Sequence, residues 1–197
     1  MVILAAGAAR RMGLPKLLLP WGGPTILEHT IAQWGSLGAW QIAVVCAAGG
    51  EPVQDELDRL HFPEANRISN PDPERGMFSS VRCAAAWNGW NAGLEHWVIS
   101  LGDQPQVRGE TLRALLDFAA ADPNRICQPL RKGRRRHPVL MPRAAFDGLK
   151  NCSCSDFKEF LESRAYALAG FESADAGLDF DIDTPADYER ARRLCFG

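Results

Sequence analysis

The feature that most limits the fold of this chain is a regular alternation of short apolar segments with longer amphipathic ones. The apolar segments predict strands at Met1–Ala5, Gln41–Ala47, Trp97–Leu101 and Arg125–Gln128. The segments between them predict helices at Pro24–Trp34, Pro52–Leu60, Met77–Trp90 and Gly109–Ala121. In the first of these helices, Pro24 occupies the expected first helical position. Strands that alternate with helices predict an α/β fold around a mostly parallel sheet.

The part of the chain from about residue 129 to 182 is less regular than the rest. It contains two candidate strands, His137–Met141 and Arg164–Leu168, which predict a mixed sheet edge or a small lobe. Pro185–Cys195 predicts a closing helix. Open α/β sheets bind ligands beyond the carboxyl ends of their strands, so we expect the functional loops at those ends. These loops follow Leu4, Ala47, Ile68 and Leu101.

Composition excludes several classes of protein. The chain has 197 residues, 46% of them hydrophobic and 23% charged, which predicts one globular domain with its own core rather than a disordered or collagen-like chain. No apolar run approaches the roughly 18 residues of a membrane-spanning helix, and the N-terminus lacks the basic region of a signal peptide. The six cysteines include no Cys-x-x-Cys pair and predict reduced thiols. We therefore expect a cytoplasmic protein without a membrane partner.

The charge balance argues against nucleic acid as a partner. The net charge is −2 and the pI is about 6.1, so the surface as a whole does not attract nucleic acid. One exception is Arg131–Arg136, which holds five cations in six residues without interleaved aromatic side chains. This run is either a solvated loop or a local field that attracts a polyanionic ligand.

The loop from Leu4 to Lys16 is the strongest indication of a phosphate site. It follows a predicted strand, consists largely of small residues whose backbone N–H groups can approach a phosphate, and supplies the cations Arg10, Arg11 and Lys16. It lacks both the Lys-Ser/Thr ending of a Walker A loop and the spacing Gly-x-Gly-x-x-Gly. Small residues after a first strand often serve only tight packing, but the added cations favour a cradle for a triphosphate.

Two carboxylates are candidates for binding a metal ion. Asp103 follows an apolar strand, where it is placed either to bind Mg²⁺ or to cap the turn before Pro105. Asp183 lies 80 residues later, before a predicted helix for which Thr184 is a ready N-cap. With the first loop present, we favour the metal role for both carboxylates, which would meet only in the folded chain. For Asp181 we expect a structural role.

The segment Gly76–Arg82 predicts the start of a helix that could bind a nucleotide. Ser79 and Ser80 either cap this helix or present hydroxyl and N–H groups to a base or phosphate. Asn70 offers a donor and an acceptor together, as recognition of a base requires. A lone histidine such as His137 is more often a packed or capping residue than a catalyst. No Ser-His-Asp or Cys-His arrangement in the sequence points to a nucleophilic mechanism.

Taken in order, these motifs resemble those of the MobA/MocA-type nucleotidyltransferase family, which includes molybdenum cofactor cytidylyltransferases, their guanylyl relatives and sugar-nucleotide pyrophosphorylases. The similar segments are Leu4–Lys16, Asn70 with Gly76–Val81, Leu101–Pro105, His137–Leu140 and Asp181–Pro185, and they extend over nearly the whole chain. The Asp-Gln-Pro of the third segment is similar to the cytidylyltransferase branch. The chain departs from the family at Ala9, where serine is usual, and in its short first strand.

The resemblance implies a Rossmann-like three-layer sandwich of the nucleotide-diphospho-sugar transferase type, with a mostly parallel mixed sheet. It implies a single nucleotidyltransferase domain over residues 1–197, in which about 129–182 binds the acceptor. Implied roles are catalysis for Arg11, Lys16 and Asp103, Mg²⁺ binding for Asp103 and Asp183, and acceptor binding for Arg136 and His137. The implied nucleotide-binding residues are Leu4, Ala5, Ala6, Gly7, Met12, Gly13, Asn70, Gly76, Ser79 and Ser80.

The implied reaction joins CTP to the phosphate of a molybdopterin-type acceptor and releases pyrophosphate, with an apo molybdenum hydroxylase as the expected client. A phosphate monoester has a second pKa of about 6, so its attacking oxygen is ionised near neutral pH and needs no general base. The guanylyl branch usually has glycine where this chain has Ala6, whose methyl group would narrow the space for a purine. Alternatives are GTP-dependent or sugar-phosphate transfer by the same fold, and a non-catalytic chaperone that binds nucleotide or cofactor. Pyrophosphate release distinguishes the enzymes from the chaperone.

Overall fold

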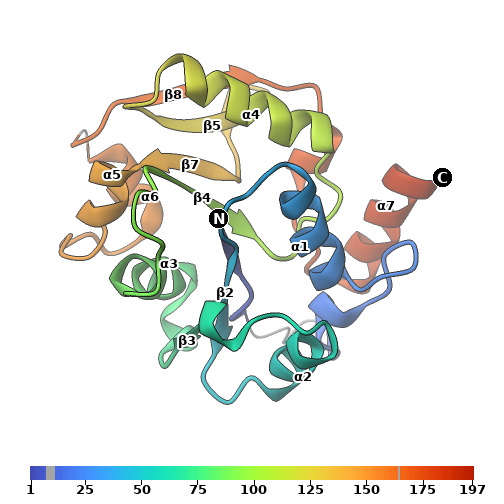
Figure 1. The fold of residues 1–197 in the computed structure, drawn as a ribbon. Helices are drawn as coiled ribbons and strands as arrows, with labels where there is room; N and C mark the ends of the chain where they lie inside the picture. Colours follow the sequence, from blue (N-terminus) through green and yellow to red (C-terminus); the bar gives the residue numbers. More distant parts are fainter. Residues whose placement is uncertain (8–11, 164) are drawn as a thin grey trace.

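The computed structural model describes residues 1–7, 12–163 and 165–197, within which eight strands form one mixed sheet (Figure 1). The strands are β1 (Val2–Leu4), β2 (Ala43–Ala47), β3 (Arg67–Asn70), β4 (His96–Leu101), β5 (Ile126–Arg131), β6 (Arg134–Arg135), β7 (Val139–Pro142) and β8 (Leu168–Glu172). Their order is β3-β2-β1-β4-β7-β5-β6, and β8 pairs with β5. The first four strands pair in parallel, whereas β7 runs antiparallel to both β4 and β5. The carboxyl ends of β4 and β5 therefore point the same way.

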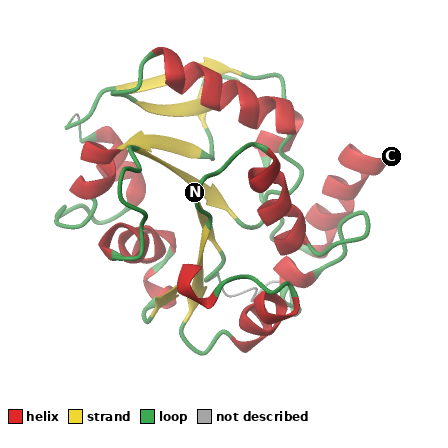
Figure 2. Cartoon of the chain, in the orientation of Figure 1, coloured by secondary structure: helices red, strands yellow, loops and turns green. Residues whose placement is uncertain are grey.

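Helices cover both faces of the sheet (Figures 1 and 2). One face carries α1 (Ile26–Ser36), α2 (Glu51–Arg59), α4 (Gly109–Ala121) and α7 (Pro185–Phe196). The other carries α3 (Met77–Ala86), α5 (Arg143–Gly148) and α6 (Phe157–Glu162). Four 3-10 helices lie in the connections described, at Lys16–Leu18, Glu64–Asn66, Pro73–Arg75 and Ala176–Asp179. The result is a three-layer arrangement with the sheet in the middle.

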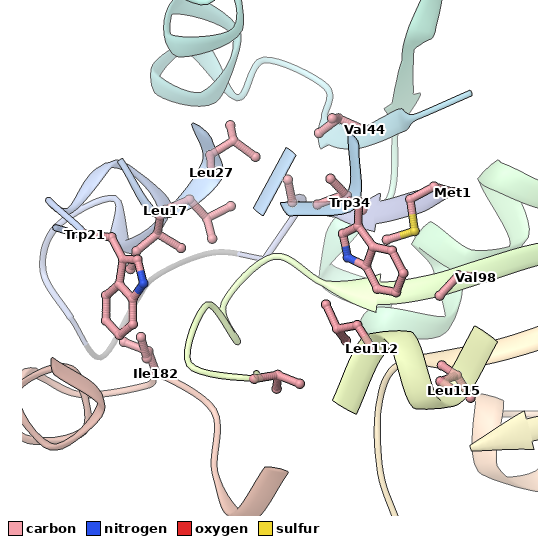
Figure 3. Packing of buried hydrophobic residues seen from close by; sticks show 14 of the residues in the cluster. Met1, Leu17, Trp21, Leu27, Trp34, Val44, Val98, Leu112, Leu115 and Ile182 are labelled. Carbon is pink, nitrogen blue, oxygen red and sulfur yellow. The ribbon is translucent and has the colours of Figure 1, made fainter. Parts of the chain in front are cut away.

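Alternate residues of the central strands supply the two cores. Ile3 and Val44 are buried against the layer that contains α1, whereas Val2 and Val45 are buried against the layer that contains α3. This period of two is what a strand covered on both faces requires. Figure 3 shows part of the first core, which includes Leu17, Trp21, Trp34, Leu112 and Ile182.

The prediction of an α/β fold around a mostly parallel sheet is confirmed. The four predicted strands correspond to β1, β2, β4 and β5, and α4 has the predicted bounds. The predicted strand His137–Met141 overlaps β7, and the closing helix begins at Pro185 as expected. Among the described residues, no helix is both long enough and apolar enough to span a membrane.

The strand expected at Arg164–Leu168 is wrong in position. The strand β8 covers Leu168–Glu172, and all five of its residues pair in parallel with β5 from Ile126 to Leu130. Pairing with β5, rather than the local sequence pattern, sets this register. Arg164 itself lies outside the described residues.

Several predicted helix ends also differ from the observed ones, and two of the differences have a clear local cause. The helix α3 ends at Ala86 rather than Trp90, because Trp87 adopts an extended backbone with φ −71° and ψ 136°. The helix α1 begins after Thr25, whose side chain accepts a hydrogen bond from the first turn, so Pro24 precedes the cap instead of opening the helix.

Candidate active site

The carboxyl ends of β1 and β4 lie side by side where the strand order reverses. β1 pairs with β2 on one side and with β4 on the other, and Leu4 is in register with Leu101. Gly102 follows and donates its N–H to the Leu4 carbonyl oxygen at 3.0 Å. A Cβ at Gly102 would lie 2.8 Å from that oxygen, so this close approach requires glycine. Open α/β sheets bind ligands at such a switch point.

Two adjoining cavities of about 360 and 430 Å³ lie over these strand ends. Residues shared by both walls are Ala6, Gly7, Pro73 and Glu74. The cavity of 360 Å³ also contains Lys16 and extends along the loop after β2. The cavity of 430 Å³ contains Asp103 and the first turn of α3. Together, within the described part of the chain, they form a crevice whose walls carry one cation, Lys16, and several carboxylates.

Lys16 joins two carboxylates from distant parts of the chain. Its Nζ donates hydrogen bonds to Asp103 Oδ2 and, at 3.1 Å, to Asp183 Oδ1. The side chains of Lys16, Asp103 and Asp183 are 12%, 19% and 35% exposed, respectively. Burial alone would lower the pKa of Lys16, but the charges and hydrogen bonds of the two carboxylates outweigh it and raise the pKa. The lysine is therefore a cation at neutral pH.

Asp181 adds a third carboxylate to the crevice. Its Oδ1 accepts a hydrogen bond from Gln104 Nε2 at 2.6 Å, and it lines the cavity of 430 Å³. Asp181 keeps contact with solvent, but partial burial of its carboxyl group and the negative charge of Asp103 raise its pKa. We refer to Lys16, Asp103, Asp181 and Asp183 as the carboxylate cluster. From the sequence we expected a structural role for Asp181, and that expectation did not include its position in the cavity wall.

The carboxylate cluster has the right donors for a hard cation but does not enclose one. Lys16 contacts both Asp103 and Asp183, so the two carboxylates are close enough to share one cation. Within the described residues, no group of three or more His, Cys, Asp or Glu side chains is arranged to hold a metal ion. A divalent ion here would need further ligands from water or a substrate, as is usual for Mg²⁺.

The small residues of the first loop line the crevice where the structure describes them. Those in the cavity walls are Leu4, Ala5, Ala6 and Gly7. Met12 is buried, and Gly13 has a φ of 65°, which favours glycine. Ala9, Arg10 and Arg11 lie outside the described residues, so the catalytic role of Arg11 stays a prediction.

Asn70, Ser79 and Ser80 form one hydrogen-bonded unit. Asn70 is fully buried; its Nδ2 donates to Ser79 Oγ at 2.8 Å and to Ser80 Oγ at 2.9 Å. Its Oδ1 accepts a hydrogen bond from the Asp72 N–H at 2.9 Å, so both the nitrogen and the oxygen of the amide have hydrogen-bond partners within the protein. The N-cap of α3 is Gly76, without a side-chain cap, so neither serine caps this helix. Gly76 and Ser80 line the cavity of 430 Å³, whereas Asn70 and Ser79 line a separate cavity of about 400 Å³.

His137 lies at the carboxyl end of β4. β7 runs antiparallel to β4, with Val139 paired to Ile99, and His137 precedes β7 by two residues, on the side of the carboxyl end of β4. Burial lowers the pKa of His137, and a hydrogen bond to the Ile99 backbone and the charge of Asp103 oppose this only in part. The imidazole is therefore neutral at pH 7. Its Nδ1 is buried and has no hydrogen-bond partner among the residues described.

The basic run Arg131–Arg136 comprises the last residue of β5, the turn at residues 132–133, β6 and the residue after it. Arg131 Nε lies 3.2 Å from Asp179 Oδ2, and Lys132 Nζ lies 3.7 Å from the same oxygen. Burial alone would raise the pKa of Asp179, but Arg131, Lys132 and Arg136 together lower it. We refer to these three cations and Asp179 as the basic cluster. Sequence reasoning missed Asp179 and Gly102; the acidic stretch before the last helix was the available signal for the first.

Comparison with known proteins agrees with this arrangement. Residues 1–167 match the family described as MobA-like NTP transferase domain. The chain is 28% identical over 197 residues to the molybdenum cofactor cytidylyltransferase of Escherichia coli, covering 97% of this chain and 94% of that protein. It is also 28% identical over 206 residues to the molybdenum cofactor guanylyltransferase of Mesorhizobium japonicum, covering 98% and 94%. The crystal structure of Rv0371c from Mycobacterium tuberculosis is similar with a TM-score of 0.73 at 26% identity, covering 98% and 95%.

Proposed function

The chain belongs to the family of MobA-like NTP transferase domains, and from that premise we propose that it transfers CMP from CTP to the phosphate of a molybdopterin-type acceptor. The products would be a cytosine dinucleotide form of the cofactor and pyrophosphate. The observation that carries the proposal is the contact of one cation, the Lys16 ammonium, with both Asp103 and Asp183 beside the crevice. A site of this kind can hold positive charge next to the phosphate groups of a substrate, which is the main requirement of nucleotidyl transfer.

Asp103 and Asp183 are the residues that would hold Mg²⁺. Both are carboxylates, the ligands that Mg²⁺ prefers, and both reach a single point, the position of Lys16 Nζ. When bound, the ion would supply positive charge that neutralises the reacting α-phosphate. The role of the protein is to hold two oxygen ligands of the ion and to leave its remaining coordination positions to the substrate.

Lys16 exchanges partners when the triphosphate binds. Its ammonium moves from the two carboxylates to the oxygens of the departing pyrophosphate, where charge-assisted hydrogen bonds of the same kind replace those it gives up. Arg11 binds the same pyrophosphate. The backbone and small side chains that line the triphosphate are those of Leu4, Ala5, Ala6, Gly7, Met12 and Gly13.

The base lies between the first loop and the start of α3. Gly76 and Ser80 face it from the crevice wall, and Asn70 holds the two serines in place through its two donated hydrogen bonds. Ala6, which lines both cavities, restricts the space for a purine through its methyl group. An Ala6→Gly variant is therefore expected to use GTP better relative to CTP. An unchanged ratio would remove Ala6 from the choice of base.

The acceptor approaches from the side of His137 and Arg136. The basic cluster, of which Arg136 is part, attracts the anionic acceptor, and the neutral His137 offers a ring nitrogen without a partner among the described residues. Because the phosphate of the acceptor is ionised near neutral pH, the attacking oxygen needs no base. Catalysis then consists of holding two polyanions in line and neutralising their charge.

The relatives leave the choice of base open, because proteins named for cytidylyl and guanylyl transfer are equally identical to this chain. The Asp-Gln-Pro turn and Ala6 favour CTP. As a client that receives the product we propose an apo molybdenum hydroxylase, and six free thiols support a reducing compartment such as the cytoplasm. GTP-dependent transfer, transfer to a sugar phosphate and a non-catalytic chaperone are the rival functions.

The test is release of pyrophosphate with Mg²⁺ and each of the four ribonucleoside triphosphates, with and without molybdopterin. We expect release with CTP that depends on molybdopterin and is abolished in Asp103→Ala. A preference for GTP would assign the chain to guanylyl transfer. Release of pyrophosphate that requires a sugar phosphate would identify the sugar phosphate, and not molybdopterin, as the acceptor. Binding of nucleotide without any release would favour the chaperone.

A further inference from the structure

Asp103 and Asp183 lie on irregular segments, so something else must fix their separation. Asp103 follows β4 by two residues, and Asp183 lies between the 3-10 helix Ala176–Asp179 and α7. One backbone hydrogen bond joins the two segments directly, from the Ile182 N–H to the Asp103 carbonyl oxygen at 3.2 Å. Lys16 also contacts both carboxylates, but under the proposed function it leaves them when the triphosphate binds, and one backbone bond alone then fixes their separation poorly.

Two glutamines close to Asp103 supply the further links. Gln106 is 1% exposed, and its Nε2 donates to the carbonyl oxygens of Gly177 at 3.1 Å and Phe180 at 2.7 Å. Gln104 donates to Asp181 Oδ1 at 2.6 Å. Both glutamines belong to the loop of Asp103, and all three acceptors belong to the segment that leads to Asp183. No other role for either amide emerges from the site described above.

The contact at Gly177 shows how closely the two segments are packed. A Cβ on Gly177 would lie 2.3 Å from the backbone oxygen of Gln106, so no side chain fits there. On the other side, Ile182 is fully buried in the core with Trp21 and Leu17 (Figure 3). The segment 177–182 is thus held at both ends, and the glutamines determine where it meets the loop of Asp103.

We propose that Gln104 and Gln106 are positioning residues that set the separation of Asp103 and Asp183, and through it the affinity of this pair for a divalent cation. The proposal rests on the metal role given to these carboxylates under the proposed function. Gln106 suits the task because its amide has two N–H donors for two carbonyl oxygens, which a glutamate could not supply. Gln104 in addition holds Asp181 by one oxygen.

The experiment measures binding of Mn²⁺ alone to the full chain, by the loss of the electron paramagnetic resonance signal of free Mn²⁺. Gln106→Met keeps most of the side-chain volume and removes both donors, and we expect it to raise the Kd for Mn²⁺ at least tenfold. Gln104→Met, which disturbs less buried contacts, is expected to raise it about threefold. Asp103→Asn identifies the site by abolishing binding.

The matched control is Gln41→Met. Gln41 is also a buried glutamine that links loops, since its Nε2 donates to Asn66 Oδ1 and the Gly89 carbonyl oxygen and its Oε1 accepts the Asn91 N–H. It precedes β2 and so lies at the opposite, amino end of the sheet. We expect this variant to lose thermal stability much as Gln106→Met does, while its Kd for Mn²⁺ stays within twofold of the wild type.

Two results would overturn the positioning role of the glutamines while leaving the metal role of Asp103 intact. One is an unchanged Kd in Gln106→Met; if that variant does not fold, an unchanged Kd in Gln104→Met decides instead. The other is an equal loss of affinity in Gln41→Met, which would reduce the effect to general stability. Mn²⁺ binding that survives Asp103→Asn would remove the metal role of Asp103 and this proposal with it. Glutamine-dependent Mn²⁺ binding without pyrophosphate release would leave the positioning role intact and overturn only the proposed transferase reaction.

Discussion

The carboxylate cluster and the basic cluster lie at the carboxyl ends of β4 and β5, which run in the same direction on either side of β7, yet the two clusters combine charges in opposite proportions. Among the described residues, the carboxylate cluster sets one ammonium, Lys16, against three carboxylates. The basic cluster sets one carboxylate, Asp179, against three cations. The same 3-10 helix and loop supply Asp179 to one cluster and Asp181 and Asp183 to the other.

This difference shows how one short segment can prepare two kinds of binding. An excess of carboxylates attracts a divalent cation, whereas an excess of guanidinium and ammonium groups attracts an anion. In each cluster, the minority charge keeps the like charges together while no ligand is present. Reactions that join two phosphate compounds require both kinds of binding at once, because repulsion between the substrates has to be overcome.

The largest effect should come from the carboxylate cluster. We expect Asp103→Ala to lower kcat/KM for pyrophosphate release at least a thousandfold, about 4 kcal/mol, because it removes a ligand of the metal that neutralises the reacting phosphate. Asp179→Ala serves as the control and should cost less than tenfold. Equal losses in the two variants, measured by steady-state kinetics, would break the distinction between the clusters.

Replacing Lys16 sharpens the comparison. Lys16→Met is expected to lower kcat about a hundredfold, the usual loss when one charge-stabilising group is removed. It also removes the cation that contacts Asp103 and Asp183, so binding of Mn²⁺ without nucleotide should become tighter. Titration calorimetry with Mn²⁺ checks this second effect. Weaker Mn²⁺ binding in Lys16→Met would mean that the lysine holds the carboxylates in place rather than occupying the place of the metal.

The basic cluster should respond to changes through the acceptor. Arg136→Ala is expected to raise KM for the acceptor about tenfold, equivalent to about 1.4 kcal/mol, with KM for CTP unchanged. Arg134→Ala, which alters an exposed neighbour outside the cluster, is the control and should change neither constant by more than twofold. A change in KM for CTP instead of the acceptor would place the basic cluster on the nucleotide side of the crevice.

The positions of most strands and helices along the chain could be anticipated because local patterns determine them. The apolar segments of β1, β2 and β4 and the bounds of α4 are examples, since a short continuous apolar run or a period of 3.6 is visible in a single sequence. The register of β8 could not be anticipated, because it depends on pairing with β5. The carboxylates Asp103 and Asp183 could be proposed as a pair, but their common contact with Lys16 arises only in the folded chain.

Other features of the site depend on tertiary contacts that leave little trace in the sequence. Nothing local indicates that the amide of Asn70 is occupied by Ser79 and Ser80, nor that Gly102 is required by the carbonyl oxygen of Leu4. Asp179 is a carboxylate, as are Asp181 and Asp183 close by. Only its contacts with Arg131 and Lys132 distinguish it from them. Residue type therefore predicts which chemistry is available, and the fold decides which groups share it.

The smallest expected effect is a change in thermal stability that has opposite signs in the two clusters. The pKa of Asp179 is lowered, so Asp179 stabilises the folded chain above its unfolded pKa of about 3.8, and this stabilisation is lost as the pH falls through the lower folded value. The pKa of Asp181 is raised, so its ionisation costs stability at neutral pH, and the cost disappears as the pH falls through the raised folded value toward 3.8. In metal-free buffer at pH 7, Asp179→Asn should therefore lower Tm and Asp181→Asn should raise it, each by on the order of 1–3 °C.

Thermal unfolding of the two variants and the wild type from pH 7 to pH 4 checks both signs. The gain in Asp181→Asn should shrink toward pH 4, because protonation of Asp181 then achieves the same neutralisation in the wild type. The loss in Asp179→Asn should persist over this range, because the cations of the basic cluster keep Asp179 ionised. If both variants shifted Tm in the same direction, the opposite charge excess of the two clusters would not govern their energetics, and the division of labour between metal and acceptor would lose its electrostatic basis.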